Sequence, residues 1–360
     1  MNLLFFQNII SPHQMPYIQH LPQMEGVDDV IVVVPEVSID ERESLGWAVE
    51  KWLQAEGVRF IISPTLEDVE KLFKDYSRMD TWCLFSGINA FQAVSGWLRL
   101  SLKYNIRRGV ITEPPYVYDH PLWQHAIRFA LKDWWYVKYI NKIFVMGEDY
   151  LNYYRFWSKR WEVIPFMYCT EWKERSSQVR ERGERLHIIY VGSLSHRKNV
   201  RCLFQAVALL SPAQQEQLVI GVVGDGEQRK ELEALSKNIA CEKAFFGLLP
   251  MEHVPAIMEQ YDVLVLPSLH DGWGAVVNEA LTLGLYVICS DHCGAKMLLK
   301  REDNGAVFKS NEIKSLATII SNAIQRREEI SRGVSRRIDW CGEHISEKAV
   351  AEYFVSVLRR

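Results

Sequence analysis

The sequence predicts an α/β protein built from two doubly wound, Rossmann-like domains. Short apolar runs of strand length alternate along the chain with longer amphipathic segments, which is the pattern of parallel sheets covered by helices. The chain has 360 residues, 48% of them hydrophobic and 24% charged, a composition typical of a globular protein with about two cores. A polar, charge-dense stretch separates two series of apolar runs.

The first series of runs defines an N-terminal domain over residues 1–170. Each run is rich in β-branched or aromatic residues and is followed by a segment of helical periodicity, as in βαβ units. The opening run lacks the basic leader and cleavage site of a signal peptide, so we expect a buried strand there. The expected strands are residues 2–6, 30–34, 58–62, 81–87, 109–112, 142–147 and 161–166.

The second series defines a C-terminal domain over residues 186–335. Residues 171–185, polar and without strand periodicity, predict an interdomain linker. Residues 336–360 predict a C-terminal helix, for which packing back on the first domain is one option. The expected strands of the second domain lie within residues 186–194, 217–226, 243–247, 262–268 and 285–291.

Composition excludes several classes of function. The net charge of −3 gives no reason to expect a nucleic-acid partner, and no apolar stretch of membrane-spanning length occurs. Seven scattered cysteines predict reduced thiols and a cytoplasmic location. Cys289, His292 and Cys293 do not have the spacing of a structural zinc site, so no metal site is predicted.

Ligands of open parallel sheets bind beyond the carboxyl ends of the strands, which directs attention to three turns of the second domain. After Gly192 and Ser193, the first turn places Arg197 and Lys198 near a helix start, where two cations suit a diphosphate. A solvated basic turn is the alternative. The second turn, VVGDGE, lacks the third glycine of a dinucleotide fingerprint and predicts a tight turn serving the fold.

The third turn, HDGWGAVVNEALTLG, carries two acids. Asp271 lies in the loop before a helix, and Glu279 lies about one and a half turns inside that helix. A sugar nucleotide could use both carboxylates, whereas an N-terminal cap and a helix-surface acid are the structural alternatives. The residues expected to bring free backbone groups close to a ligand are Gly272, Gly274, Ala275 and Val276.

The stretch LPSLHDGWGAVVNEALTLGLYVICSD resembles the signature of family 4 retaining glycosyltransferases, with VGSLSHRKN and VVGDGE standing before it in the expected order. The resemblance covers residues 186–308. It implies the GT-B fold, two Rossmann-like domains facing a cleft. It also implies transfer of a sugar from a nucleotide-diphosphate donor, most often a UDP- or GDP-sugar, with retention of anomeric configuration and without a required metal or other cofactor.

The resemblance assigns roles residue by residue. Asp271 takes the first acidic position, beside the donor sugar, where relatives have Glu. Glu279 takes the second, as the ribose ligand, and Lys198 with Arg197 neutralises the diphosphate. Ser193 stands where relatives often have Arg. The residues implied to bind the donor besides Glu279 are Gly192, Ser193, Gly247, Leu248, Gly272, Trp273, Gly274, Ala275 and Val276.

The acceptor side is expected in the first domain. His13, Gln14 and Glu113 follow predicted strands and could face the ligand, and a purely structural turn is the alternative at each. The stretch WLRLSLKYNIRRG mixes aliphatic and basic residues and leaves open a peripheral contact with the inner face of a membrane, although we favour an ordinary core and solvated face.

The sequence thus predicts a retaining glycosyltransferase that acts on a glycan or lipid-linked acceptor, in bacterial surface polysaccharide or glycoconjugate synthesis. A non-catalytic binding or scaffold subunit is the main alternative, because Asp271 and Ser193 depart from the pattern. A sugar-nucleotide epimerase is a weaker one, and an NAD-dependent oxidoreductase lacks the glycine fingerprint.

Overall fold

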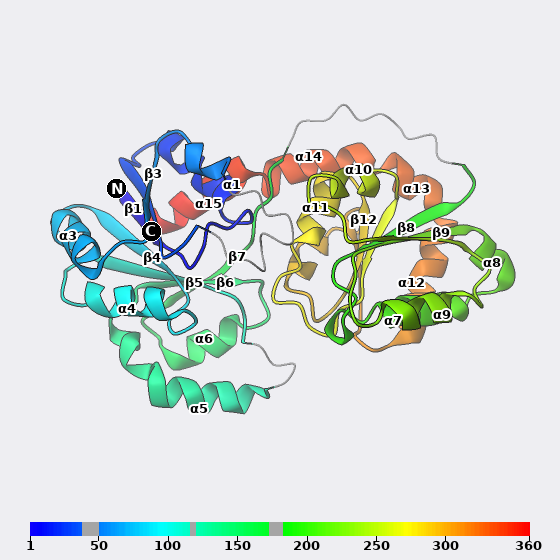
Figure 1. Ribbon diagram of the computed structural model, residues 1–360, viewed down its shortest axis with the longest axis horizontal. Helices are drawn as coiled ribbons and strands as arrows, with labels where there is room; N and C mark the ends of the chain where they lie inside the picture. Colours follow the sequence, from blue (N-terminus) through cyan, green and yellow to red (C-terminus); the bar gives the residue numbers. More distant parts are fainter. Residues whose placement is uncertain (38–49, 116–119, 173–182) are drawn as a thin grey trace. The chain divides into compact units, whose positions relative to one another are not determined.

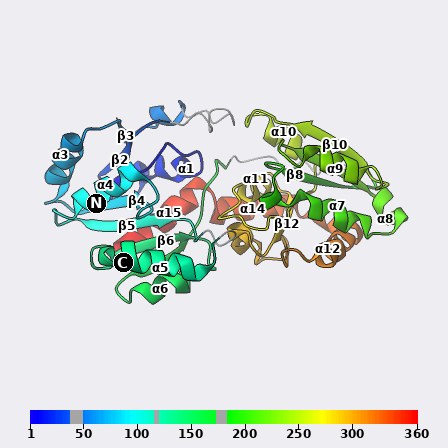
Figure 2. The ribbon, with the colours of Figure 1, turned by 60° about the horizontal axis from the view of Figure 1, so that its bottom comes forward.

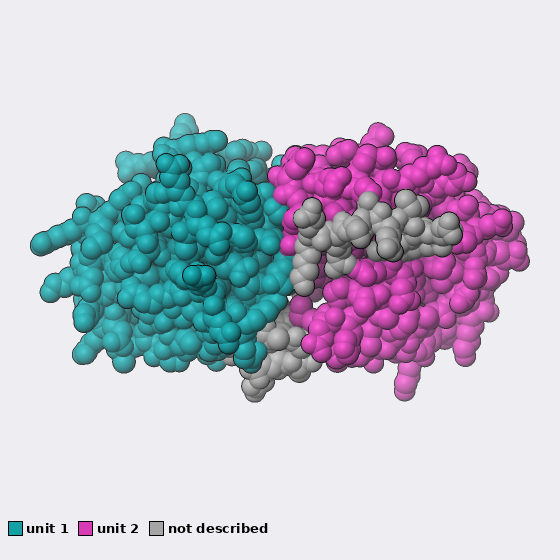
Figure 3. Space-filling model, turned by 90° about the horizontal axis from the view of Figure 1, so that it is seen from above, with its two compact units in different colours: residues 1–171, 346–360 teal, residues 172–345 magenta. Residues whose placement is uncertain are grey.

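The computed structural model describes residues 1–37, 50–115, 120–172 and 183–360. Residues 1–171 and 346–360 form one compact unit, and residues 172–345 form the other (Figure 3). Most of the predicted linker, residues 171–185, lies outside the described residues.

The first unit contains a parallel sheet of seven strands in the order β3-β2-β1-β4-β5-β6-β7. The strand β1 pairs in parallel with β2 and β4, with Leu4 opposite Ile31 and Cys83. The strands are β1 (Asn2–Phe6), β2 (Asp29–Val34), β3 (Val58–Ile62), β4 (Thr81–Ser86), β5 (Arg107–Thr112), β6 (Lys142–Met146) and β7 (Glu162–Phe166).

Helices cover both faces of this sheet (Figure 1). The helix α3 begins where Thr65 and Asp68 form a capping box, and its buried face joins a core in which Phe6 stacks on Phe85. The helices are α1 (Met15–Ile18), α3 (Leu66–Tyr76), α4 (Gln92–Ser101), α5 (Leu122–Lys132), α6 (Leu151–Trp157) and α15 (Glu347–Arg359), with 3-10 turns η1 (Leu21–Gln23), η2 (Trp52–Gln54) and η3 (Trp134–Lys138).

The second unit contains a parallel sheet in the order β10-β9-β8-β11-β12-β13. Its strands are β8 (Leu186–Val191), β9 (Leu218–Val223), β10 (Glu242–Gly247), β11 (Val263–Leu266), β12 (Tyr286–Ser290) and β13 (Gly305–Phe308). Its helices are α7 (Val200–Ala208), α8 (Pro212–Glu216), α9 (Arg229–Ser236), α10 (Val254–Met258), α11 (Val276–Thr282), α12 (Ile313–Gln325), α13 (Arg327–Arg332) and α14 (Val334–His344), with η4 (His196–Lys198) and η5 (Gly294–Leu299). The predicted fold class, two parallel-sheet α/β domains, is confirmed.

The C-terminal segment divides between the two units. Residues 336–360 were expected as one helix, but α14 lies with the second unit, where buried Arg337 donates from Nε to the carbonyl of Gly284 at 2.8 Å. The helix α15 lies with the first unit and packs on α1. Its Phe354 contacts the rings of Phe5 and Tyr17, so burial of aromatic surface holds the segment there.

No helix in the described part of the chain is long and apolar enough to cross a lipid bilayer.

Candidate active site

The sequence-predicted turns meet at the carboxyl edge of the second sheet. The strands β8 and β11 are hydrogen-bonded neighbours, with Ile188 opposite Val263. The turns that follow them therefore lie side by side, although they are far apart in the chain. One turn carries Arg197 and Lys198, and the other carries Asp271.

Lys198 and Asp271 form an ion pair. The Lys198 Nζ atom lies 2.5 Å from the Asp271 Oδ2 atom, and the two side chains are only 15% and 11% exposed. The backbone holds Asp271 in place, because its N–H donates to the His292 carbonyl and its own carbonyl accepts from the Gly294 N–H. Each charge therefore has a partner in this structure, in a place largely shielded from water.

Arg197 links the same two turns. Its Nη1 atom donates to the His270 carbonyl at 2.8 Å, and its own carbonyl accepts from the Leu269 N–H. His270 is buried, and burial lowers the pKa of its imidazole below the usual 6.5, which favours the neutral ring at pH 7. His270 was not singled out from the sequence, although it stands directly before Asp271.

The glycines near Arg197 and Lys198 let two turns pack tightly. A Cβ atom at Gly224, which has φ +122°, would lie 1.9 Å from the Gly192 carbonyl oxygen. The N–H of Leu194 donates to the carbonyl of Asp225, between the two glycines of the second turn. This contact supports a role of the G-x-G turn in packing. Ser193 is exposed on the neighbouring turn, and its carbonyl accepts from the buried hydroxyl of Tyr190.

The start of α11 depends on Gly274 and Trp273. Gly274 has φ +90°, and a Cβ atom there would lie 2.7 Å from the Cys293 sulfur. Trp273 is 2% exposed, and its Nε1 atom donates to Asn278 Oδ1 at 2.7 Å. The family resemblance implied that Trp273 binds the donor, but its side chain packs inside the unit. Asn278 was not singled out from the sequence.

Backbone groups at this helix start are available to a ligand. Among the described residues, no backbone acceptor takes a hydrogen bond from the N–H groups of Gly274, Ala275 or Val276. The carbonyl oxygen of Gly272 lies against Gly294, where only a residue without a side chain fits. Such free N–H groups favour a negatively charged ligand.

Glu279 lies half-buried on α11. Burial raises the pKa of its carboxyl from 4.5 to about 7. A carboxyl desolvated in this way is stabilised when hydroxyl groups of a ligand donate to it.

The predicted base-binding segment follows β10. The carbonyl of Gly247 accepts from the Gly224 N–H at 2.7 Å, and the Leu248 side chain is 61% exposed. The guanidinium of Arg229 lies over the Phe245 ring at 5.2 Å, next to Gly247. Arg229 was not singled out from the sequence either, because it lies well before Gly247 in the chain and local sequence does not indicate that the two meet.

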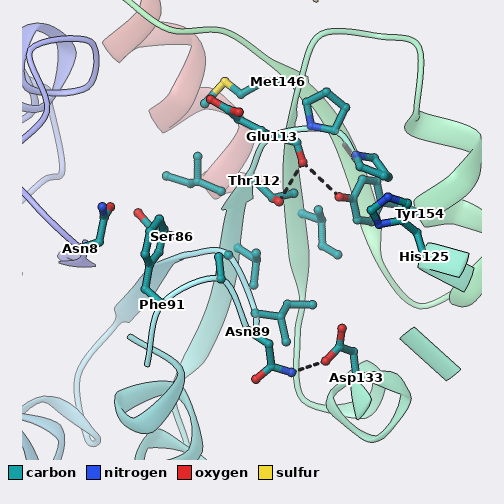
Figure 4. A pocket seen from close by; sticks show the side chains of 18 of the residues that line it. Asn8, Ser86, Asn89, Phe91, Thr112, Glu113, His125, Asp133, Met146 and Tyr154 are labelled. Carbon is teal, nitrogen blue, oxygen red and sulfur yellow. Dashed lines mark hydrogen bonds between the residues drawn. The ribbon is translucent and has the colours of Figure 1, made fainter. Parts of the chain in front are cut away.

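The first unit has a cavity of about 630 Å³ at the carboxyl edge of its sheet, and Gln14 and Glu113 line it. Glu113 accepts through Oε1 from the Tyr168 hydroxyl at 2.8 Å, and the buried Gln14 accepts through Oε1 from Gln7 at 2.7 Å. His13 is not among the lining residues that the structure describes. Figure 4 shows Glu113 close to Thr112 and Tyr154, and Asp133 bonded to Asn89.

The basic residues of the stretch WLRLSLKYNIRRG have partners within the first unit. Arg99 donates to the Tyr136 hydroxyl and Lys103 pairs with Glu70. Arg107 pairs with Asp80, and Arg108 is buried, donating to Ser101. These contacts fit the core and solvated face that we favoured.

The side chains of His292 and Cys293 contact backbone carbonyls. The Cys293 sulfur donates to the Trp273 carbonyl at 2.9 Å, and the His292 Nδ1 atom contacts the Leu269 carbonyl. In residues 1–37, 50–115, 120–172 and 183–360, no group of three His, Cys, Asp or Glu side chains could hold a metal ion.

Comparison with known proteins identifies relatives of this chain. Residues 172–335 match the family model described as glycosyl transferases group 1. The Campylobacter jejuni GalNAc-α-(1→4)-GalNAc-α-(1→3)-diNAcBac-PP-undecaprenol α-1,4-N-acetyl-D-galactosaminyltransferase is 28% identical over 224 residues, 59% of this chain and 61% of that protein. The 2-deoxystreptamine glucosyltransferase of Streptomyces kanamyceticus is 38% identical over 97 residues, 26% of this chain and 25% of that protein.

The chain thus spans less than two thirds of the length of these curated relatives. Among solved structures, that of Anabaena HepE in complex with UDP has a TM-score of 0.71 and 16% identity, over 100% of both chains. At this identity the likeness shows the fold alone. Residues 172–335 are thus similar to the group 1 glycosyltransferases, as the resemblance to family 4 predicted, and the chain has the GT-B fold.

Proposed function

We propose that the protein is a retaining glycosyltransferase that moves a sugar from a nucleotide-diphosphate donor to a glycan or lipid-linked acceptor. The observation that carries the proposal is the shielded Lys198–Asp271 ion pair beside the free N–H groups at the start of α11. It lies at the edge of the sheet where ligands of parallel α/β domains bind.

The proposed chemistry follows from charge. An acceptor hydroxyl forms the new bond to the anomeric carbon on the face from which the phosphate leaves, and the departing diphosphate takes the hydroxyl proton. Breaking the bond between the anomeric carbon and the phosphate oxygen puts negative charge on that diphosphate. Lys198 and Arg197 stabilise that charge from positions already held by Asp271 and the His270 carbonyl. Because these groups need little reorganisation, the stabilisation acts mainly on the transition state. No protein nucleophile and no metal ion are needed for this step.

We assign the ribose hydroxyls to Glu279 and the nucleobase to the backbone around Gly247 and Leu248. A half-buried carboxyl gains most from two neighbouring hydroxyl donors, as a ribose presents them. The bound UDP of the Anabaena structure makes UDP the first nucleotide to test, with GDP next.

We further propose a lipid-linked or glycan acceptor and a role in bacterial surface polysaccharide or glycoconjugate synthesis. The name of the Campylobacter relative, which specifies an undecaprenol-linked acceptor, supports this choice. The cavity of the first unit, with Gln14 and Glu113 in its lining, is the proposed acceptor-binding region.

Calorimetric titration tests the donor site. UDP, GDP, ADP and TDP are titrated into the wild-type chain, with and without magnesium, and into Glu279→Ala. We expect one diphosphate to bind equally with and without the metal and to lose at least about tenfold in affinity in the variant. Glu302→Ala, which changes an exposed acid of the same unit, is the matched control.

Turnover is then measured with the corresponding nucleotide sugar, with NMR recording the anomeric configuration of the first product. Retention of configuration is the expected result. Binding without turnover would favour the non-catalytic binding subunit, and an inverted product would contradict the mechanism. Absence of binding to any of the diphosphates would contradict the donor site itself.

A further inference from the structure

The helix α5 turns an apolar stripe toward solvent. Trp123, Ile127 and Leu131 are 61%, 51% and 76% exposed, and their spacing of four residues puts them on one side of the helix. Phe129 is the buried residue of α5 and points the other way. A helix at a protein surface ordinarily presents polar residues outward, so α5 departs from the usual pattern.

Two neighbouring elements also expose large apolar side chains. Trp134, at the start of η3, is 61% exposed, and Phe156 of α6 is 79% exposed. The rings of Phe129 and Trp157 lie 4.6 Å apart and join α5 to α6. Figures 1 and 2 show these two helices side by side in the first unit. We call Trp123, Ile127, Leu131, Trp134 and Phe156 together the apolar face.

Basic side chains accompany the apolar face. The exposed basic residues of α5, η3, α6 and the turn after α6 are Arg128, Lys132, Lys138, Arg155, Lys159 and Arg160. The acidic residues on these elements are fewer: Asp133 is half-buried and bonded to Asn89, and Glu148 and Asp149 precede α6. The charge beside the apolar face is therefore mainly positive, which selects an anionic partner.

We propose that the apolar face docks on an anionic lipid bilayer, with α5 lying in the plane of the interface. Tryptophan side chains prefer the headgroup level, while Ile127, Leu131 and Phe156 reach the acyl boundary. The long Lys and Arg side chains extend to lipid phosphates. This surface is not the stretch WLRLSLKYNIRRG, whose basic residues already have protein partners.

The same helix also borders the cavity of the first unit. His125, Arg128 and Phe129 are among the residues that line it. A bilayer against the outer side of α5 thus lies within about one helix diameter, about 10 Å, of the cavity. A lipid-linked acceptor, as in the proposed function, would then have its polar end near the cavity. The docking itself does not rest on sugar transfer.

Vesicle flotation without nucleotide tests the docking, so its outcome is independent of the donor site. The full chain is mixed with phosphatidylcholine vesicles that contain or lack phosphatidylglycerol. We expect binding to the anionic vesicles, reduced about tenfold on neutral vesicles or at about 0.5 M salt. The variant Ile127→Ser/Leu131→Ser/Phe156→Ser should bind at least about tenfold more weakly. The matched control is Leu66→Ser/Met79→Ser, two exposed apolar residues of the same unit.

A single-site probe covers the case in which the triple variant does not fold. All seven native cysteines are buried, so an environment-sensitive dye attached to Leu131→Cys reports on that position alone. Its emission should shift to the blue on anionic vesicles, and that of Leu66→Cys should not. Equal binding by wild type and triple variant, or an unshifted Leu131→Cys dye, would overturn the proposal. So would a concentration-dependent dimer that the triple variant abolishes, because a second copy would then cover the apolar face.

Discussion

The ion pair between Lys198 and Asp271 yields a prediction about stability that a double-mutant cycle can measure. Removing one member of a largely buried pair costs about 3 to 5 kcal/mol when the remaining charge loses its partner. Asp271 has a short side chain and a backbone held by hydrogen bonds, so in Lys198→Met its carboxylate stays in place without a positive partner. We therefore expect Lys198→Met to lower the free energy of unfolding by about 3 kcal/mol. Asp271→Asn should cost less, about 1 to 2 kcal/mol, because the long Lys198 side chain can turn toward water.

The double variant Lys198→Met/Asp271→Asn distinguishes a coupled pair from two independent residues. Since it leaves neither charge unpaired, we expect it to be more stable than Lys198→Met alone. Urea unfolding followed by circular dichroism gives the free energies, and turnover of the nucleotide sugar is measured on the same proteins. Lys198→Met should lower turnover by about two to three orders of magnitude, because it removes a positive charge that stabilises the leaving diphosphate.

The turnover of the double variant shows how Asp271 acts. If Asp271 works by positioning Lys198, adding Asp271→Asn to Lys198→Met changes turnover little. If Asp271 contacts the donor sugar, as the family resemblance implies, the two losses multiply. Stability losses that simply add would refute the coupling, and wild-type turnover in Lys198→Met would remove Lys198 from the mechanism.

Further predictions concern stability. Folding raises the pKa of Glu279 from 4.5 to about 7, so its stabilising contribution is present below pH 4.5 and is lost as the pH rises through 7. Glu279→Gln should therefore match the wild type at pH 4 and be more stable at pH 8, by up to about 3 kcal/mol in urea unfolding; equal stabilities at pH 8 would contradict the shift. Gly224→Ala, whose Cβ would meet a backbone oxygen at 1.9 Å, should lower the thermal midpoint, whereas Gly96→Ala, in open space on α4, should raise it slightly. Trp273→Phe should cost about 1 to 3 kcal/mol, because the buried Asn278 amide loses its donor; retention of the wild-type midpoint would contradict that hydrogen bond.

Most of the fold was predictable from local patterns. Apolar runs such as those at residues 30–34 and 263–266 are completely buried strands in the structure, because a parallel sheet between two helical layers leaves no exposed face. The C-terminal segment was harder. The sequence shows helical periodicity throughout residues 336–360, and nothing in that periodicity says that Phe354 finds its partners near residue 5.

The candidate site was predictable in its residue types and less so in its contacts. Lys198, Asp271 and Glu279 were singled out from motifs and a family resemblance, and their assigned roles in catalysis stay predictions. The burial of Trp273 could not be predicted, because a tryptophan beside glycines is equally typical of a ligand-binding loop and of a packed core. His270 and Arg229 were not singled out, because their contacts are with residues from distant parts of the chain.

The sequence by itself determined the two α/β domains, the order of the strands along the chain and the turns that carry charge. Those properties depend on neighbouring residues, whose spacing decides whether a segment buries one face, both faces or none. Only the tertiary structure decided which charges meet, as when Lys198 pairs with a carboxylate 73 residues away. It also decided that α5 leaves Leu131 in solvent, because burial is set by what packs against a helix and not by the helix's own sequence.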